Sequence, residues 1–143
     1  MTAGDRVEAL GDWASGLAAS APAPATLARW GLGLMLVAAG AHKLLRPEGW
    51  TVYVTGWLAP WLVVSPTTFM LANGYLELGF AALLLADRYT AFAALVAAVS
   101  LAVTTGYLAV VWVDTGQFGD VVARDVGLTG LALAVLVDAL QTE

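Results

Sequence analysis

Long apolar runs, separated by short polar segments, dominate the pattern of this chain. The longest, residues 89–113, contains 25 residues without a single charge. A helix needs about 20 predominantly apolar residues to cross the hydrocarbon core of a bilayer. The pattern therefore predicts an all-α membrane protein, in which a domain of residues 26–143 forms a four-transmembrane-helix bundle. The expected helices cover about 27–45, 67–86, 89–113 and 121–140.

A soluble helical bundle is the alternative to this membrane fold. Each helix of a soluble bundle needs a charged or polar outer face in contact with water. The run 89–113 offers no such face, because it contains no charged residue at any position. The membrane bundle is therefore the favoured interpretation.

The first 25 residues differ from the rest of the chain. They carry acidic residues and no long apolar stretch, which argues against a secretory signal. Apolar residues recur there at helical spacing and predict an amphipathic helix on the membrane surface, with a flexible solvated tail as the alternative. These apolar residues are Val7, Leu10, Ala14 and Leu17.

The segment 48–66 is apolar but short, and Pro60 interrupts it. Four aromatic residues in it step by three and four positions, as on one helical face, and aromatic rings favour the headgroup level of a membrane. We expect an interfacial or re-entrant segment that leaves both termini on the same side, with a fifth span as the alternative. The aromatic residues are Trp50, Tyr53, Trp57 and Trp61.

The amino-acid composition argues against several kinds of cofactor, metal and nucleic-acid site. The chain is 60% hydrophobic and 12% charged, has a net charge of −5, and contains no cysteine and one histidine, His42. These counts argue against disulfides, iron–sulfur clusters, cysteine-ligated zinc and bis-histidine haem, and we expect no metal site. A single lysine in an acidic chain leaves no basic surface for nucleic acid, so we expect no nucleic-acid partner.

One carboxylate is expected deep in the membrane. Glu77 lies 10 residues into the predicted second helix, about 15 Å along it and near the midplane. A charge there is costly unless it is neutralised or paired inside the bundle. Under the four-span topology Lys43 and Arg124 lie at the same end, so we expect Glu77 to pair with one of them. Asn73 and Tyr107 would complete its hydrogen bonds.

These considerations define a candidate intramembrane polar site. Three interpretations remain open: an ion pair that only fixes helix register, a functional pocket for a quinone headgroup, small anion or proton relay, and a contact with another subunit. Its members are Lys43, Asn73, Glu77, Tyr107, Arg124 and Asp125.

We predict structural roles for the remaining polar residues. Asp114, Asp120 and Asp125 match no calcium-loop spacing and are expected to be solvated loop acids. Arg29 and Asp138 are expected at the opposite end of the bundle from Lys43, where they are able to pair.

Small residues are expected to pack the helices, because close backbone approach must replace the weak apolar drive in lipid. Four residues, spaced four apart, form a ridge on the third predicted helix, and glycines recur on the first and fourth. The ridge comprises Ala94, Ala98, Ala102 and Gly106, and the glycines are Gly31, Gly33, Gly40, Gly127 and Gly130.

Three stretches of the sequence resemble the DoxX-like family of small four-helix membrane proteins. The first runs from RWGLG at 29–33 to GAHKLLRP at 40–47, the second is ELG at 77–79, and the third is RDVGL at 124–128. The resemblance extends over 29–140. The aromatic segment 48–66 and the acidic amino terminus have no counterpart in it.

The resemblance implies a multi-pass protein of the cell membrane with cytoplasmic termini and no metal or haem of its own. It also implies quinone-linked oxidoreduction involving thiosulfate or another small sulfur compound, with Lys43, Glu77, Arg124 and Asp125 as functional residues near a quinone or sulfur anion. The function expected is a membrane oxidoreductase subunit, in the lipid bilayer with a protein partner or a second copy. A non-catalytic accessory subunit is the alternative, and a small transporter ranks third because the chain lacks an internal repeat.

Overall fold

The computed structural model describes residues 2–142, and within this range all regular secondary structure is helical. The long helices agree with the predicted ones to within three residues at their ends, and α2 begins at Pro24, three residues earlier than predicted. The elements are α1 (Ala3–Ser20), α2 (Pro24–Leu45), the 3-10 helices η1 (Pro47–Tyr53) and η2 (Ala59–Trp61), α3 (Pro66–Leu85), α4 (Thr90–Thr115) and α5 (Gly119–Thr142).

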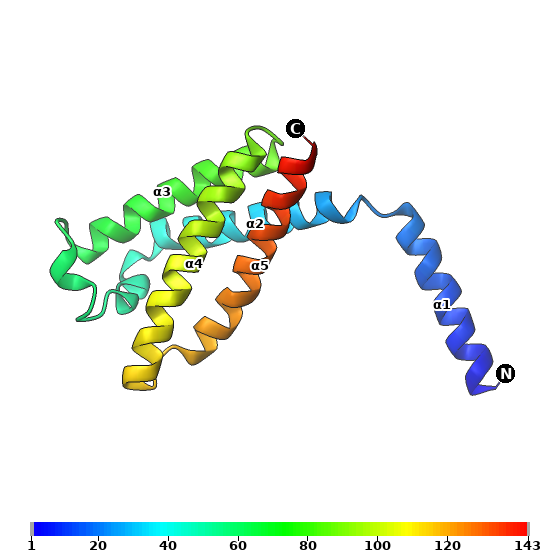
Figure 1. The fold of residues 1–143 in the computed structure, drawn as a ribbon, viewed down its shortest axis with the longest axis horizontal. Coiled ribbons are helices and arrows are strands. Elements are labelled where there is room, and N and C mark those ends of the chain that lie inside the picture. Colours follow the sequence, from blue (N-terminus) through cyan, green and yellow to red (C-terminus); the bar gives the residue numbers. More distant parts are fainter. Residues whose placement is uncertain (1, 143) are drawn as a thin grey trace.

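The four long helices form two antiparallel hairpins, α2–α3 and α4–α5. The hairpins pack together at one end, beside the short turn between α3 and α4, and diverge toward the other end (Figure 1). We call these the turn end and the loop end, because η1, η2 and the α4–α5 connection lie at the second. The core at the turn end is built from Leu32, Leu84, Ala93 and Ala132, all with no exposed surface.

Two glycines set the distance between α2 and α3. A Cβ added to Gly40 would lie 2.8 Å from the carbonyl oxygen of Gly74, and one added to Gly74 would lie 3.0 Å from that of Gly40. The helix backbones are therefore in direct contact at this crossing, in the manner of small-residue packing in membranes. The prediction for Gly40 is confirmed. Its partner Gly74 was not singled out in the sequence.

The other small residues divide into two groups. Gly33 faces Leu85 closely, and the ridge residues Ala94 and Ala98 are buried in the core at the turn end. Ala102 and Gly106 are exposed, because α4 and α5 diverge from the other hairpin toward the loop end. A Cβ at Gly127 or Gly130 would meet nothing within 4 Å, so the packing prediction for these two glycines is wrong.

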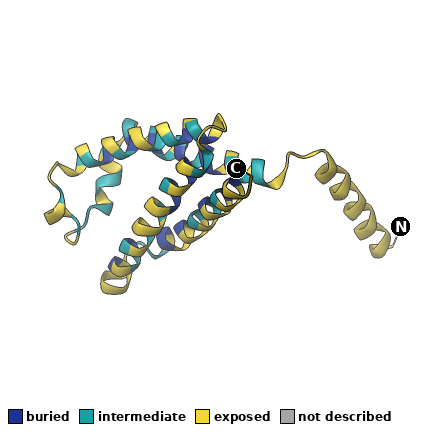
Figure 2. Ribbon diagram, turned by 45° about the horizontal axis from the view of Figure 1, so that its top comes forward, coloured by how far each residue is buried: buried dark blue, intermediate teal, exposed yellow. Residues whose placement is uncertain are grey.

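Large apolar side chains cover the outside of the bundle. Buried residues are confined to the facing surfaces of the helices, as Figure 2 shows, while side chains such as Phe92, Val99 and Val137 are exposed. Within the residues described, α3 and α4 are long and apolar enough to cross a membrane. α2 and α5 have sufficient length, at 22 and 24 residues, but do not meet the same criterion of apolarity and low charge.

The segment between α2 and α3 stays at the loop end. It contains η1 and η2 with irregular backbone between them, so it is too interrupted to form a fifth span. Because this backbone is not one continuous helix, the predicted single aromatic face does not form. Trp57 and Trp61 are exposed, whereas Trp50 and Tyr53 are partly buried.

The amino-terminal segment is helical. α1 begins with a capping box between Thr2 and Asp5, contains no buried residue and projects away from the bundle (Figure 1). Of the two alternatives predicted for this segment, a helix and a flexible tail, the structure contains the helix. Its location on a membrane surface stays a prediction.

Arg29 of α2 bonds to the end of α3 and to the α3–α4 turn, with a different partner from the one expected. Its guanidinium donates to the Leu84 carbonyl and lies 3.4 Å from the Asp87 carboxylate. The predicted pairing with Asp138 is wrong, because the α3–α4 turn brings Asp87 to the arginine first. Asp138 lines a separate cavity of about 410 Å³ next to Arg29.

The glycine crossing gives a testable prediction for stability. Gly40→Ala places a methyl group against the α3 backbone, so the helices must separate, at a cost of about 1–3 kcal/mol. The thermal midpoint of the purified protein in detergent should fall. Gly79→Ala is the matched control, because its Cβ would meet nothing within 4 Å and alanine favours a helix. An equal midpoint for the two variants would contradict the close crossing.

Candidate functional site

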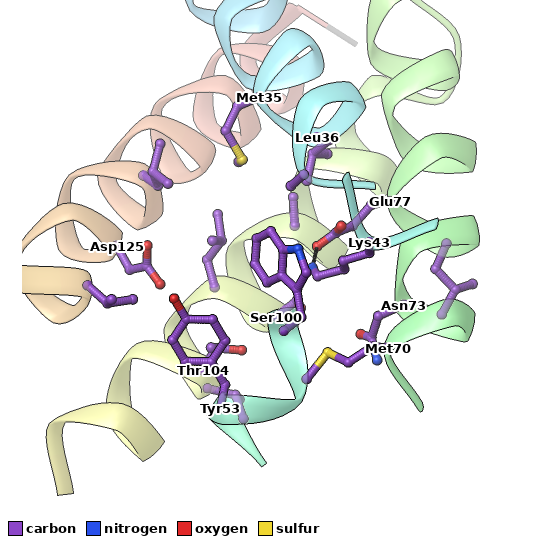
Figure 3. A pocket seen from close by; sticks show the side chains of 18 of the residues that line it. Met35, Leu36, Lys43, Tyr53, Met70, Asn73, Glu77, Ser100, Thr104 and Asp125 are labelled. Carbon is purple, nitrogen blue, oxygen red and sulfur yellow. Dashed lines mark hydrogen bonds and ion pairs between the residues drawn. The ribbon is translucent and has the colours of Figure 1, made fainter. Parts of the chain in front are cut away.

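A cavity of about 770 Å³ fills the space where the two hairpins diverge. We call it the inter-hairpin cavity. Its wall is mainly apolar, with side chains such as Met35, Leu36, Met70 and Phe80, and a few polar groups point into it (Figure 3). All six residues of the predicted site line this one cavity, although they come from four different helices. They are Lys43, Asn73, Glu77, Tyr107, Arg124 and Asp125.

Lys43 and Glu77 form an ion pair across the α2–α3 crossing. The lysine side chain is 10% exposed and that of the glutamate 23%. Their Cβ atoms flank the two glycines of the crossing, so the close helix approach brings the charges together. Of the two cations predicted to pair with Glu77, Lys43 is the one that does so. Lys43 and Arg124 both line the same cavity at the loop end, as the four-span topology predicts.

The second cation, Arg124, has a different role. Its Nε lies 2.9 Å from Oδ1 of the neighbouring Asp125, and its side chain is 57% exposed. Asp125 itself is buried and lies within α5, so the prediction of a solvated loop acid is wrong for this residue. The helix begins at Gly119, which turns the carboxylate at 125 inward toward the cavity.

The other predicted partners of Glu77 bond elsewhere. Asn73 donates from Nδ2 to the Phe69 carbonyl of its own helix, at 2.9 Å. Tyr107 donates to the Tyr53 carbonyl at 3.0 Å. The prediction that these two residues complete the hydrogen bonds of Glu77 is therefore wrong. Oε2 of Glu77 is buried and has no hydrogen-bond partner among residues 2–142.

Trp50 lines the cavity at the loop end. Its indole N–H donates to Nδ1 of His42 at 2.8 Å, and Nζ of Lys43 lies 4.4 Å from the centre of its ring. A cation over an indole face is attracted by the electrons of the ring. The aromatic side chain therefore helps to hold the lysine in place. This role differs from the headgroup contact predicted for Trp50.

Tyr107 anchors the same segment to α4. Its hydroxyl lies 2.6 Å from Oγ1 of Thr55 and accepts from the Thr55 N–H at 3.2 Å, in addition to the bond with the Tyr53 carbonyl. The Tyr53 ring packs against Phe118, with 5.3 Å between ring centres. The connection between α2 and α3 is thereby fixed to the other hairpin, beside the cavity.

The polar groups of the cavity lie on opposite sides. In Figure 3, Lys43 and Glu77 extend from the α2–α3 side and Asp125 from α5 on the other, with Ser100 and Thr104 of α4 between them. Ser100, Thr104 and Tyr107 of α4 all line the cavity. The cavity is therefore mainly apolar, with charged side chains on the α2–α3 side and on the α5 side.

Sequence reasoning missed Trp50, Tyr53 and Thr55 as parts of this site. Their place depends on how the irregular segment after α2 folds back, and no helical periodicity describes such a segment. The proximity of Trp50 to His42 and Lys43 in sequence was the available signal. Within residues 2–142, no three histidine, aspartate or glutamate side chains gather to hold a metal ion.

The ion pair gives a prediction for folding. Lys43→Met leaves Glu77 without its cation in a largely apolar site, which should destabilise the protein by about 3 kcal/mol, the low end for a buried pair because the glutamate is partly exposed. The double variant Lys43→Met/Glu77→Met removes both charges and should recover much of the loss. Thermal unfolding of the wild type, both single variants and the double variant measures the coupling. Additive effects would show that the pair does not stabilise the fold.

Comparison with known proteins identifies the family. The model of the DoxX family matches residues 25–113, which contain α2, the η1–η2 segment, α3 and most of α4. Comparisons with curated proteins and with solved structures each returned no match. The family match ends before α5, so the expected extent to residue 140 is not supported, and Arg124 and Asp125 lie outside it. Because the match covers more than half of the chain, this protein belongs to the DoxX family of membrane proteins.

Proposed function

We propose that this protein is an integral membrane subunit that binds a quinone in the inter-hairpin cavity, in support of quinone-linked oxidoreduction by a larger complex. The single observation that carries the proposal is the Lys43–Glu77 pair within a mainly apolar cavity of about 770 Å³. Ligand sites of this kind combine an apolar wall with a few placed polar groups. A quinone has the matching division into an apolar tail and a polar head.

The cavity is accessible from the side of the bundle. Leu76 of α3 and Val103 of α4 both line it, and they are 59% and 66% exposed. We take these exposed lining side chains as the border of a lateral opening between the two helices. In a bilayer, such an opening faces the lipid, where quinones reside. A membrane-soluble ligand is therefore favoured over one that arrives from water.

A small sulfur anion fits the cavity less well. Binding an anion there requires a free cation, but Lys43 is paired with Glu77 and Arg124 with Asp125. We therefore place any chemistry of thiosulfate or a related compound on a partner protein. The sequence also has no cysteine and a single histidine, so a redox partner would supply the electron-carrying group.

We propose that all four long helices span the membrane, including α2 and α5. Their inward charges have partners: Arg29 contacts Asp87, Lys43 contacts Glu77, and Asp125 contacts Arg124. Intramembrane charges that pair inside a bundle are tolerated. Both helices also expose apolar side chains on their outer faces, including Leu34 and Trp30 on α2 and Val126, Leu133 and Val137 on α5.

The topology is testable by labelling, because the natural chain contains no cysteine. Trp61→Cys and Asp120→Cys lie at the loop end, and Arg88→Cys lies at the turn end; all three positions are exposed. In sealed vesicles an impermeant maleimide should label the first two from one side and the third from the other. Labelling of positions 61 and 88 from the same side would refute the four-span arrangement.

Ligand binding is testable by filling the cavity. Ser100 lines the cavity and is exposed to it, so Ser100→Phe should block a quinone headgroup while leaving the packed core unchanged. Val99→Phe is the matched control, because Val99 is exposed but does not line the cavity. We expect binding of a decyl-substituted benzoquinone, measured by calorimetry in nanodiscs, to weaken at least about tenfold in Ser100→Phe only.

The alternative outcomes of this experiment are distinct. No binding of the quinone by the wild type would refute the proposal and favour the non-catalytic accessory role. Equal binding by wild type and Ser100→Phe would place the ligand elsewhere on the protein and also refute the proposed site.

A further inference from the structure

We infer that α1 lies in the interface of the bilayer at the turn end, and that its acidic face makes it bind zwitterionic lipid in preference to anionic lipid. This inference goes beyond the ligand of the inter-hairpin cavity and does not depend on quinone binding. It rests on the proposed crossing of the membrane by α2. Three observations carry it: the two faces of α1, its short connection to α2, and the sign of its charge.

One face of α1 is apolar and uncovered. Four large apolar side chains recur there at steps of three and four residues, so they form one stripe along the helix. They are Val7, Leu10, Trp13 and Leu17, with exposed fractions between 51% and 69%. No residue of α1 is buried. A contiguous apolar surface of this kind marks a contact with a membrane or with another protein.

The opposite face of α1 is acidic. Asp5, Glu8 and Asp12 also step by three and four residues, and at about 100° per residue they lie on the side away from the apolar stripe. Arg6 is the one basic residue of the helix, so three acids against one arginine give α1 a net charge of −2. Arg6 lies seven residues before Trp13, at the edge of the stripe, where its long side chain is able to reach lipid phosphate.

The connection to α2 holds α1 at the level of the membrane surface. Only Ala21, Pro22 and Ala23 separate the two helices, and the ψ angles of the two alanines, 153° and 143°, make this segment extended. Three extended residues span about 10 Å. Because a membrane-spanning α2 begins at Pro24, the carboxyl end of α1 lies within that distance of the turn-end surface. α1 then runs at a steep angle to α2, and so along the bilayer (Figures 1 and 2).

This tether favours lipid over another protein as the cover of the apolar stripe. A helix held about 10 Å from the bilayer surface has a high effective concentration there, so a contact of only four large side chains holds it in place. A separate protein would bind the same small stripe against the full loss of its translational and rotational freedom. The stripe therefore fits the bilayer that the rest of the chain already occupies.

The acidic face determines which lipids α1 prefers. Most interfacial helices carry lysine and arginine on their polar face and are attracted to anionic lipid. α1 has the opposite sign of charge. A leaflet rich in anionic lipid has a surface potential of about −30 mV, which repels a net charge of −2 and weakens binding about tenfold. Salt screens this repulsion, so added salt strengthens the contact of α1 and weakens that of a basic helix.

Two spin labels on opposite faces test the location of α1. Ala14→Cys lies in the apolar stripe and Ala19→Cys on the acidic side, both alanines are exposed, and the natural chain has no cysteine. In the full-length protein in phosphatidylcholine nanodiscs, oxygen, which concentrates in lipid, should reach the label at position 14. A water-soluble nickel chelate should not reach it. The label at position 19 should show the reverse.

Two results would overturn the membrane contact. Equal access of the nickel chelate to both labels would place α1 in water. A label at position 14 that neither oxygen nor the nickel chelate reaches would show that a second copy of the chain or another protein covers the stripe.

Matched charge variants test which face contacts lipid. Leu17→Glu and Ala19→Glu add the same charge to opposite faces of α1. Leu17→Glu should release α1 from phosphatidylcholine nanodiscs, because it puts a carboxylate into the apolar stripe, whereas Ala19→Glu should leave α1 bound. The label at position 14 reports both results. Equal release by the two variants would contradict the proposed orientation.

The lipid preference is tested with nanodiscs that contain about equal parts of phosphatidylcholine and anionic phosphatidylglycerol. The ratio of bound to free α1, read from the spectrum of the label at position 14, should fall by about fivefold or more, and about 1 M salt should restore most of it. Glu8→Gln/Asp12→Asn leaves α1 with no net charge and should bind both lipids equally. An unchanged ratio for the protein with its natural acidic face would overturn the preference.

Maleimide labelling of Trp61→Cys and Arg88→Cys separates this inference from the proposed topology. If these two positions are labelled from the same side, the crossing of α2 fails and the inference fails with it. If they are labelled from opposite sides while α1 is found in water, only the inference fails.

Discussion

The contact between the α2 and α3 backbones at Gly40 and Gly74 is the constraint on which the rest of this structure depends. In lipid, apolar side chains gain little by leaving their surroundings, so close backbone packing must hold helices together. The same contact places Lys43 and Glu77 on adjoining positions of two helices. One packing interaction therefore builds the first hairpin and assembles the charged pair of its cavity.

The cavity exists because the second hairpin packs against the first at one end only. Small side chains at the turn end, such as Ala93, Ala94 and Ala132, allow the helices to approach closely. Toward the loop end, η1 contacts both hairpins, since its Tyr53 packs against Phe118 and accepts from Tyr107. Trp50 bonds to His42 of α2 and Tyr107 of α4 bonds to the Tyr53 carbonyl, so these two residues fix the η1 segment beside the cavity.

Much of the fold and the membership of the site were predictable from sequence. The apolar runs located the four long helices to within a few residues, because their periodicity and length follow from local chain composition. The four-span topology placed Lys43 and Arg124 at the same end of the bundle. The free-energy cost of a carboxylate deep in the membrane required a partner for Glu77. The geometry of the hydrogen bonds was not predictable. Asn73 and Tyr107 found nearer partners in Phe69 and Tyr53.

By itself, the sequence determined the helical class, the helix positions and the need to neutralise Glu77, since these depend on local apolarity and on the cost of an intramembrane charge. Only the tertiary structure decided which cation pairs with Glu77, that Asp125 turns inward, and that Trp50 lines the cavity. Those outcomes depend on the angle at which two hairpins cross and on the path of an irregular connection. No local pattern encodes either quantity, because both arise from contacts between residues distant in the chain.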